Sequence, residues 1–111
     1  MSFITLRITT DRNNTKTTLK FEGRVAGAWI SECFQAWQSL IPDLGTKKLC
    51  IDLCGVTFVD SAGKRFLAEI YRKHRVQFLT NSPLTRYFAE SAIHDSADAI
   101  STPANANRRV N

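Results

Sequence analysis

The sequence predicts a single α/β domain with a mixed sheet and elements in the order β-β-α-β-α-β-α. Two observations indicate this class. Apolar residues alternate with a period of two in some segments, as in strands, and recur at helical spacing in others. After an initial pair of strand segments, helical and strand segments alternate along the chain. The chain has 111 residues, the size of one domain, and its hydrophobic content of 43% is typical of globular proteins.

The first two strands are expected to form a hairpin. Residues 3–9 (FITLRIT) alternate between apolar and polar, and residues 17–23 (TTLKFEG) do so again. The intervening residues 11–16 (DRNNTK) are polar and rich in turn formers. This arrangement is typical of a β-hairpin, with Gly23 at its end.

A helix and a central strand are expected next. Residues 26–41 carry apolar side chains at helical spacing, and Pro42 is expected to end the helix. Residues 49–59 (LCIDLCGVTFV) are apolar on nearly both faces, which is typical of a strand in the middle of a sheet. Asp52 is the exception, so it needs a loop amide, a basic side chain or a place near a sheet end.

The second half of the chain repeats this alternation. A second helix is predicted from Ser61, a short strand over residues 76–80 and a third helix over residues 81–93. Ser82 is expected to cap the third helix, with Pro83 in its first turn. The expected apolar stripe of that helix is formed by Leu84, Tyr87, Phe88 and Ile93.

The domain is predicted to span residues 1–94, followed by a polar, flexible tail over residues 95–111. No apolar run approaches the roughly 20 residues of a membrane helix, and the N-terminus lacks the pattern of a signal peptide. We therefore expect a cytoplasmic protein without a membrane partner. The three cysteines are expected to be free, buried thiols; they are Cys33, Cys50 and Cys54.

Several chemical motifs are incomplete. Ser61 and Lys64 have the S-x-x-K spacing of some serine hydrolases, but the other elements of those enzymes are missing. The Gly63-Lys64 pair lacks the upstream glycine of a phosphate-binding loop, because Phe58 holds that position, and Arg65 follows where Ser or Thr is required. We expect no catalytic residue, no cofactor and no metal site.

Basic residues gather in the second helix, and the formal net charge of the chain is +5. Such a group is a possible phosphate footprint, although a solvated helix face explains most runs of this kind. No helix-turn-helix pattern is present. Nucleic acid is not favoured as a partner, but a basic nucleotide- or nucleic-acid-binding domain stays open as an alternative. The group consists of Lys64, Arg65, Arg72, Lys73 and Arg75, with His74 among them.

Ser61 has two further readings. A serine between a strand and a helix is expected to cap the helix with its hydroxyl. A hydroxyl at a helix start is also accessible to a kinase, and a phosphate there adds roughly −1.5 to −2 charge, which the helix N-terminus tolerates.

The segment IDLCGVTFVDSAG, followed by an amphipathic helix, a short strand and NSPLTRYFAESA, resembles the STAS domain of anti-sigma factor antagonists. The resemblance spans about residues 3 to 93. It implies a four- or five-stranded sheet with helices mainly on one face, no catalysis, and docking onto an anti-sigma-type serine kinase or related regulatory protein. It makes Ser61 the phosphate acceptor, with Asp52 and Gly23 as supporting residues. The implied partner-binding surface is formed by Asp60, Ser61, Ala62, Gly63, Lys64 and Arg65.

The chain departs from the family pattern at Lys64, where an apolar residue is usual, and in its polar tail. This tail replaces the C-terminal strand and helix that are common in the family, so we expect an exposed sheet edge or helix face, which favours a homodimer. The alternative function is accordingly a scaffold or self-associating domain in which Ser61 only caps its helix.

Overall fold

The N-terminal alternation forms the predicted hairpin. The structure, a computed structural model, describes residues 6–101. Strand β1 (Leu6–Arg12) pairs antiparallel with β2 (Lys16–Val25), with Leu6 opposite Gly23. The turn between them is closed by Asn13, whose side-chain oxygen accepts hydrogen bonds from the amides of Thr15 and Lys16, both at 2.9 Å.

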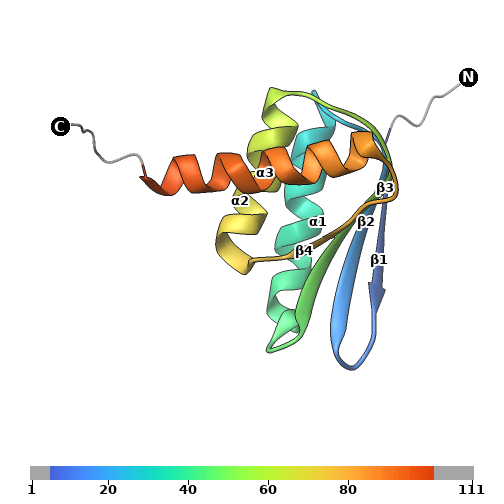
Figure 1. Cartoon of the computed structure of the whole chain (residues 1–111). Helices are drawn as coiled ribbons and strands as arrows, with labels where there is room; N and C mark the ends of the chain where they lie inside the picture. Colours follow the sequence, from blue (N-terminus) through green and yellow to red (C-terminus); the bar gives the residue numbers. More distant parts are fainter. Residues whose placement is uncertain (1–5, 102–111) are drawn as a thin grey trace, which may run out of the picture.

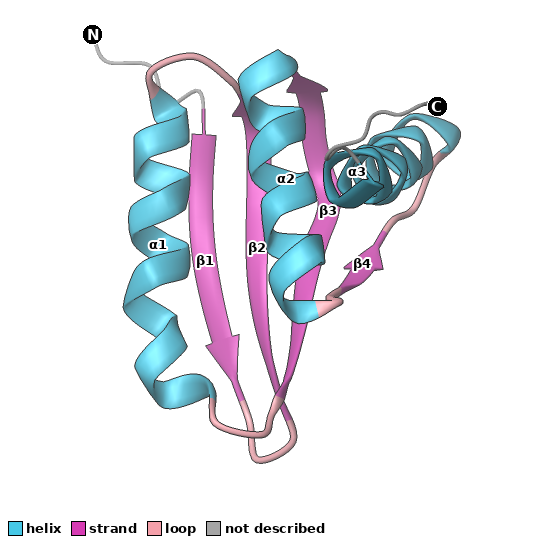
Figure 2. Ribbon diagram, turned by 90° about the vertical axis from the view of Figure 1, so that its left-hand side faces the viewer, coloured by secondary structure: helices cyan, strands magenta, loops and turns pink. Residues whose placement is uncertain are grey.

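The remaining elements alternate as predicted. Strand β3 (Lys48–Val59) pairs parallel with both β2 and β4 (Gln77–Leu79), which gives the described sheet the order β1-β2-β3-β4. The helices are α1 (Trp29–Leu44), α2 (Ser61–His74) and α3 (Pro83–Ser101). Figures 1 and 2 show all three on one face of the sheet, so the predicted fold class is confirmed.

An aromatic cluster packs between β2, α1 and α2, with the partly exposed Phe34 at its edge. The ring of Phe66 from α2 meets Phe21, Phe34 and Trp37 edge-on, with centroids 4.9 to 6.2 Å apart. The indole N–H of Trp37 donates a 2.9 Å hydrogen bond to Nε2 of His74. His74, the last residue of α2, is thereby linked to α1 through Trp37.

The predicted ends of α1 and β2 are wrong. Helix α1 continues through Pro42 to Leu44. A proline in the last turn removes only one backbone hydrogen bond, and the buried side chain of Leu44 holds that turn against the core. Gly23 does not end β2, because the strand runs on to Val25. Gly23 has a φ of 109° and lies beside a shift in the register between β2 and β3, a conformation that suits glycine.

Helix α3 begins as predicted but buries a different face. The amide of Thr85 donates to the Ser82 hydroxyl, and the amide of Ser82 donates to the Thr85 hydroxyl, both at 3.1 Å, so the predicted cap at Ser82 is confirmed. Of the predicted stripe only Phe88 is buried, while Leu84 and Tyr87 are 49% and 53% exposed. The buried face consists of Thr85, Phe88, Ala89, Ala92 and Ser96.

The small residues of this face let α3 cross α2 closely (Figure 1). Helix α3 also continues past the expected domain end at residue 94, so residues 95–101 of the expected tail are helical. The rest of that tail, residues 102–111, lies outside the described residues.

The cysteines are free thiols as predicted, although burial is complete only for Cys33 and Cys50, and Cys54 is partly exposed. Burial raises the pKa of the Cys33 thiol to about 12, so this side chain is an inert part of the core.

Candidate functional site

The candidate site lies where the carboxyl ends of β2 and β3 lead into helices α1 and α2. Asp60 connects these two crossovers. Its Oδ1 accepts a 2.8 Å hydrogen bond from the amide of Gly63 in the first turn of α2. Its Oδ2 accepts a 2.9 Å hydrogen bond from the amide of Gly27, in the loop before α1. One carboxylate thus holds the start of α2 against the neighbouring loop.

Asp60, and not Ser61, is the N-cap of α2. Asp60 has the extended backbone that an N-cap requires, with φ −88° and ψ −174°, and Ser61 is the first helical residue. The prediction that Ser61 caps this helix is therefore wrong. The physical reason is that aspartate and serine cap helices about equally well, and Asp60 has the added partner at Gly27.

Ser61 is consequently left with an accessible side chain. It is exposed, and its hydroxyl makes no hydrogen bond within residues 6–101. The backbone that carries it is fixed by the Asp60 hydrogen bonds on one side and by the helix on the other. An exposed hydroxyl that makes no hydrogen bond within the described residues, on a fixed backbone, is accessible to modification by another protein.

The charge of Asp60 is stabilised locally. Hydrogen bonds from the amides of Gly63 and then Gly27 hold the pKa of the Asp60 carboxyl below its ordinary value of 3.8. The carboxylate is therefore ionised at neutral pH, and its charge is directed at backbone amides.

Gly63 brings the start of α2 into close contact with the end of β2. A Cβ at this position would lie 2.2 Å from the carbonyl oxygen of Val25 and 2.8 Å from a methyl group of Val59. Only glycine fits this approach, which explains the glycine in terms of packing. The adjacent Ala62 lines a groove of about 370 Å³ between α1 and α2. The other residues that line the groove are Ile30, Phe34, Arg65, Phe66 and Glu69.

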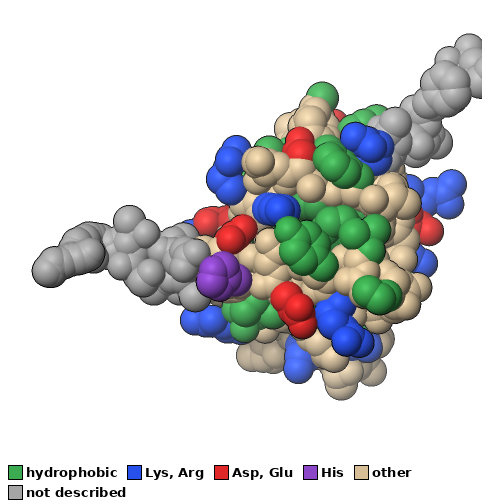
Figure 3. Space-filling view, turned by 45° about the horizontal axis from the view of Figure 1, so that its top comes forward, with side chains coloured by type: hydrophobic (Ala, Val, Ile, Leu, Met, Phe, Trp, Pro, Cys, Tyr) green, Lys and Arg blue, Asp and Glu red, His purple; other side chains and the backbone are tan. Residues whose placement is uncertain are grey.

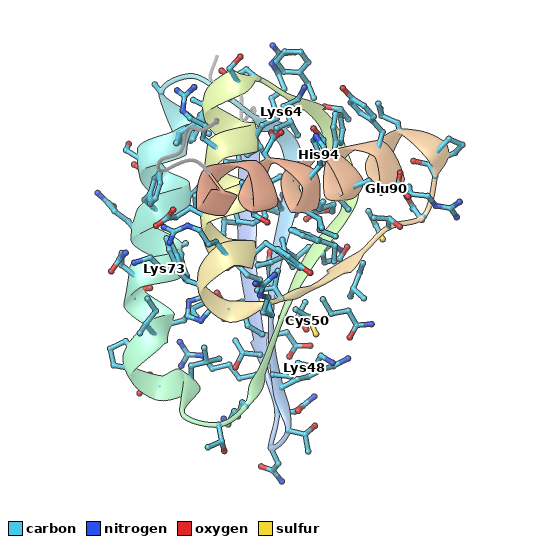
Figure 4. The ribbon with its side chains drawn as sticks, turned by 60° about the vertical axis from the view of Figure 1, so that its left-hand side comes forward. Lys48, Cys50, Lys64, Lys73, Glu90 and His94 are labelled. Carbon is cyan, nitrogen blue, oxygen red and sulfur yellow. The ribbon has the colours of Figure 1, made fainter. Side chains whose placement is uncertain are left out.

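Lys64 faces α3. Its ammonium lies 5.4 Å from the ring centroid of Tyr87 and 3.4 Å from the Tyr87 hydroxyl oxygen, to which it donates a hydrogen bond. Figure 4 places Lys64 near the start of α2, at the end of the molecule opposite Lys48 and Cys50. Arg65 is exposed and borders both the α1–α2 groove and a smaller one between α2 and α3.

The two predicted supporting residues do not join this group equally. Gly23 lies near the end of β2 at the same end of the sheet, opposite Val56. Asp52 lies within β3, about 26 Å of extended chain before Asp60 at about 3.3 Å per residue. Its Oδ1 accepts a 2.9 Å hydrogen bond from the amide of Cys54, so its partner is a backbone amide of its own strand.

Three residues near the carboxyl ends of β2 and β3 and the start of α2 were not among the predicted site residues. Phe58 is 39% exposed, and the guanidinium of Arg24 lies over its ring at 4.3 Å from the centroid. Tyr87 was assigned to the buried face of α3. A sequence signal exists only for Phe58, which falls out of phase with the inward-facing residues at the end of β3.

Within the described residues, His, Cys, Asp and Glu side chains do not gather in groups of three or more that could hold a metal ion. No helix in residues 6–101 has the length and apolar character needed to cross a membrane.

Comparison with known proteins identifies the fold. No protein-family model matches the chain, and no curated protein matches it. The structure is similar to the crystal structure of an anti-sigma factor antagonist from Mycobacterium paratuberculosis, with a TM-score of 0.65 and 20% identity. That similarity covers 95% of this chain and 86% of the other. A solved structure of Mglu is also similar, with a TM-score of 0.55 and 20% identity, over 68% of this chain and 19% of that one. The STAS-like fold implied by the sequence is thus confirmed.

Proposed function

We propose that the chain is a regulatory, protein-binding module without catalytic activity, whose binding is switched by phosphorylation of Ser61. The observation that carries the proposal is the hydroxyl of Ser61, which is exposed, free of hydrogen bonds within the described residues and fixed at the start of α2. The fold of an anti-sigma factor antagonist supports a regulatory role. The implied partner is a serine kinase of the anti-sigma type or a related regulator in the cytoplasm.

The position of Ser61 makes a phosphate compatible with the fold. A phosphate at the first helical residue lies at the positive end of the helix dipole. It also lies beside the Asp60 carboxylate, so this surface becomes strongly anionic on phosphorylation. A partner that docks on the unmodified surface is then repelled.

The test is phosphorylation by a serine kinase of the anti-sigma type with ATP, followed by mapping of the phosphate by mass spectrometry. We expect phosphate on Ser61 and none on the Ser61→Ala protein. Ser39→Ala is the matched control, because Ser39 is an exposed serine on α1, away from the start of α2. Phosphate found only at other serines, or a Ser61→Ala protein that still leaves its partner on kinase treatment, would show that Ser61 is not the switch.

A further inference from the structure

Strand β1 is a free edge of the sheet that is long and regular. It pairs with β2 on one side, and no strand of residues 6–101 lies on its other side, as Figure 2 shows. All seven of its residues pair with β2 without a register shift, whereas β4 at the opposite edge has only three residues. Proteins usually shield such edges with proline, lysine, a bulge or a short strand. Residues 6–12 contain neither proline nor lysine, so this edge is open to another strand.

The charged residues of β1 indicate which strand fits there. Side chains alternate along a strand, and Ile8 packs against the core on the helix side of the sheet. Arg7 and Asp11 therefore project on the uncovered face, on either side of Thr9. Neither Arg7 nor Asp11 makes an ion pair within the described residues. The strand thus carries one unpaired charge of each sign, equally far from its central residue, and this arrangement is complementary to a second copy of itself turned by a half rotation.

We propose that β1 pairs antiparallel with β1 of a second copy of the chain, around a two-fold axis at Thr9. This register pairs the whole strand from Leu6 to Arg12. It places Arg7 of each copy opposite Asp11 of the other, which gives two cross-strand pairs of opposite charge, and it places the two Thr9 residues opposite each other. A shift by two residues in either direction shortens the ladder and separates Arg7 from Asp11. The charges therefore select the register as well as the partner.

The helix side of the edge is compatible with this pairing. Ile8 is half-buried in the single chain, and in the dimer it lies opposite Thr10 of the second copy, which covers more of its side chain. Helix α1 lies in the helix layer and not in the plane of the sheet, so it leaves the edge of β1 accessible (Figure 1). An ion pair of 3.5 Å between Arg12 and Asp43 holds the last turn of α1 beside β1. The dimer makes the two α1 helices antiparallel neighbours, one on each side of the axis.

The pairing leaves the candidate functional site free. Ser61 follows β3, which β2 separates from β1, so the Ser61 hydroxyl stays exposed in both copies. Because the two copies run in opposite directions, their Ser61 residues lie at opposite ends of the joined sheet. The face on the side of α3, where Figure 3 shows hydrophobic side chains between charged ones, also stays open, since α3 and β4 lie towards the edge opposite β1. The dimer therefore presents one candidate site at each end, and it forms independently of phosphorylation.

The experiment is sedimentation equilibrium of the full chain over a range of concentrations. We expect most of the wild type to be dimeric at about 100 μM. Arg7→Glu and Asp11→Lys should each raise the dimer Kd about tenfold or more, because each change turns two attractive pairs into two repulsive ones. An equimolar mixture of the two variants should form dimers with a Kd within about threefold of the wild type, because one variant is acidic at both positions and the other is basic at both.

Lys48→Glu is the matched control, since it makes the same change in net charge as Arg7→Glu at an exposed residue of β3, away from the β1 edge. Its dimer Kd should stay within about twofold of the wild type, because salt screens distant surface charges. Melting curves followed by circular dichroism check that each variant folds, since Arg7 also lies opposite Glu22 of β2. Asp11 lies opposite Thr18, so Asp11→Lys tests the interface without a clash of like charges inside the chain.

Three results overturn the proposal: a wild type that stays monomeric at about 200 μM, dimers that both charge variants leave unchanged, and a mixture that associates no better than either variant alone. Ser61→Ala should dimerise as the wild type does, because Ser61 lies outside the interface. Intact dimers that a kinase does not phosphorylate at Ser61 count against the proposed function alone. Monomers that are still phosphorylated at Ser61 count against the dimer alone.

Discussion

Replacing Gly63 with alanine tests how closely α2 approaches the end of β2. The added Cβ would lie 2.2 Å from the Val25 carbonyl oxygen, about 1 Å less than a normal carbon–oxygen contact of about 3.3 Å. Because this neighbour is backbone, the start of α2 must shift. Overpacking of this kind costs about 3 kcal/mol at the upper end of its usual range. Alanine recovers about 1 kcal/mol of helix propensity, which leaves a net loss of about 2 kcal/mol.

The measurement is the free energy of unfolding from urea denaturation, together with a melting temperature that should fall by roughly 10 °C. Gly55→Ala is the control. Its added Cβ also meets another residue, at 2.8 Å, but the nearest atom belongs to the side chain of Glu22, which can rotate away on the uncovered face of the sheet. We expect Gly55→Ala to change stability by no more than about 0.5 kcal/mol. If Gly63→Ala proved as stable as the wild type, the close approach of α2 to β2 would be wrong.

Three further outcomes are expected from denaturation measurements. Ser61→Ala should change the free energy of unfolding by less than about 0.5 kcal/mol, because this residue is not the cap. Asp60→Ala should lower the melting temperature more than Ser61→Ala does. The opposite order of melting temperatures would show that Ser61 is the cap. Burial lowers the pKa of His74 below its ordinary value of 6.5, so the unfolded chain takes up the proton first. The free energy of unfolding should therefore fall as the pH drops below about 6.5. His74→Gln keeps a hydrogen-bond acceptor for Trp37 but does not titrate, so this variant should show a weaker dependence of stability on pH. Equal slopes of stability against pH in the two proteins would exclude His74 as the source. Phe66→Ala should cost about 3–5 kcal/mol, and a loss below about 1 kcal/mol would mean that the aromatic cluster is not the centre of the core.

The fold followed from periodicity because each strand and helix has a strong, regular apolar pattern. Helix α3 shows where that reasoning stops. Counting apolar residues placed Leu84 and Tyr87 on the buried face, whereas the structure buries Ala89 and Ala92 there. The choice depends on how near α2 lies, and a close crossing favours small side chains over large ones. A single sequence does not contain that distance.

The junction before α2 shows a different limit. The sequence places Asp60 and Ser61 side by side at the end of a strand, and both residue types cap helices about equally well. The choice is made by the Gly27 amide, which reaches Asp60 from a loop far away in the sequence. Local preference thus located the junction correctly, but tertiary contact decided which residue caps and which hydroxyl is free.

These contacts also bear on how a phosphate at Ser61 would act. The residue before Ser61 is tied to two separate amides, and Gly63 is pressed against the Val25 carbonyl. A backbone held on both sides has little freedom to rearrange when a group is added to an exposed side chain. The first helical position also accommodates negative charge without loss of the helix. We therefore expect that the larger effect of a phosphate on Ser61 would be electrostatic: it would reverse the sign of the charge that Lys64 presents beside Tyr87, while the backbone around it keeps its shape.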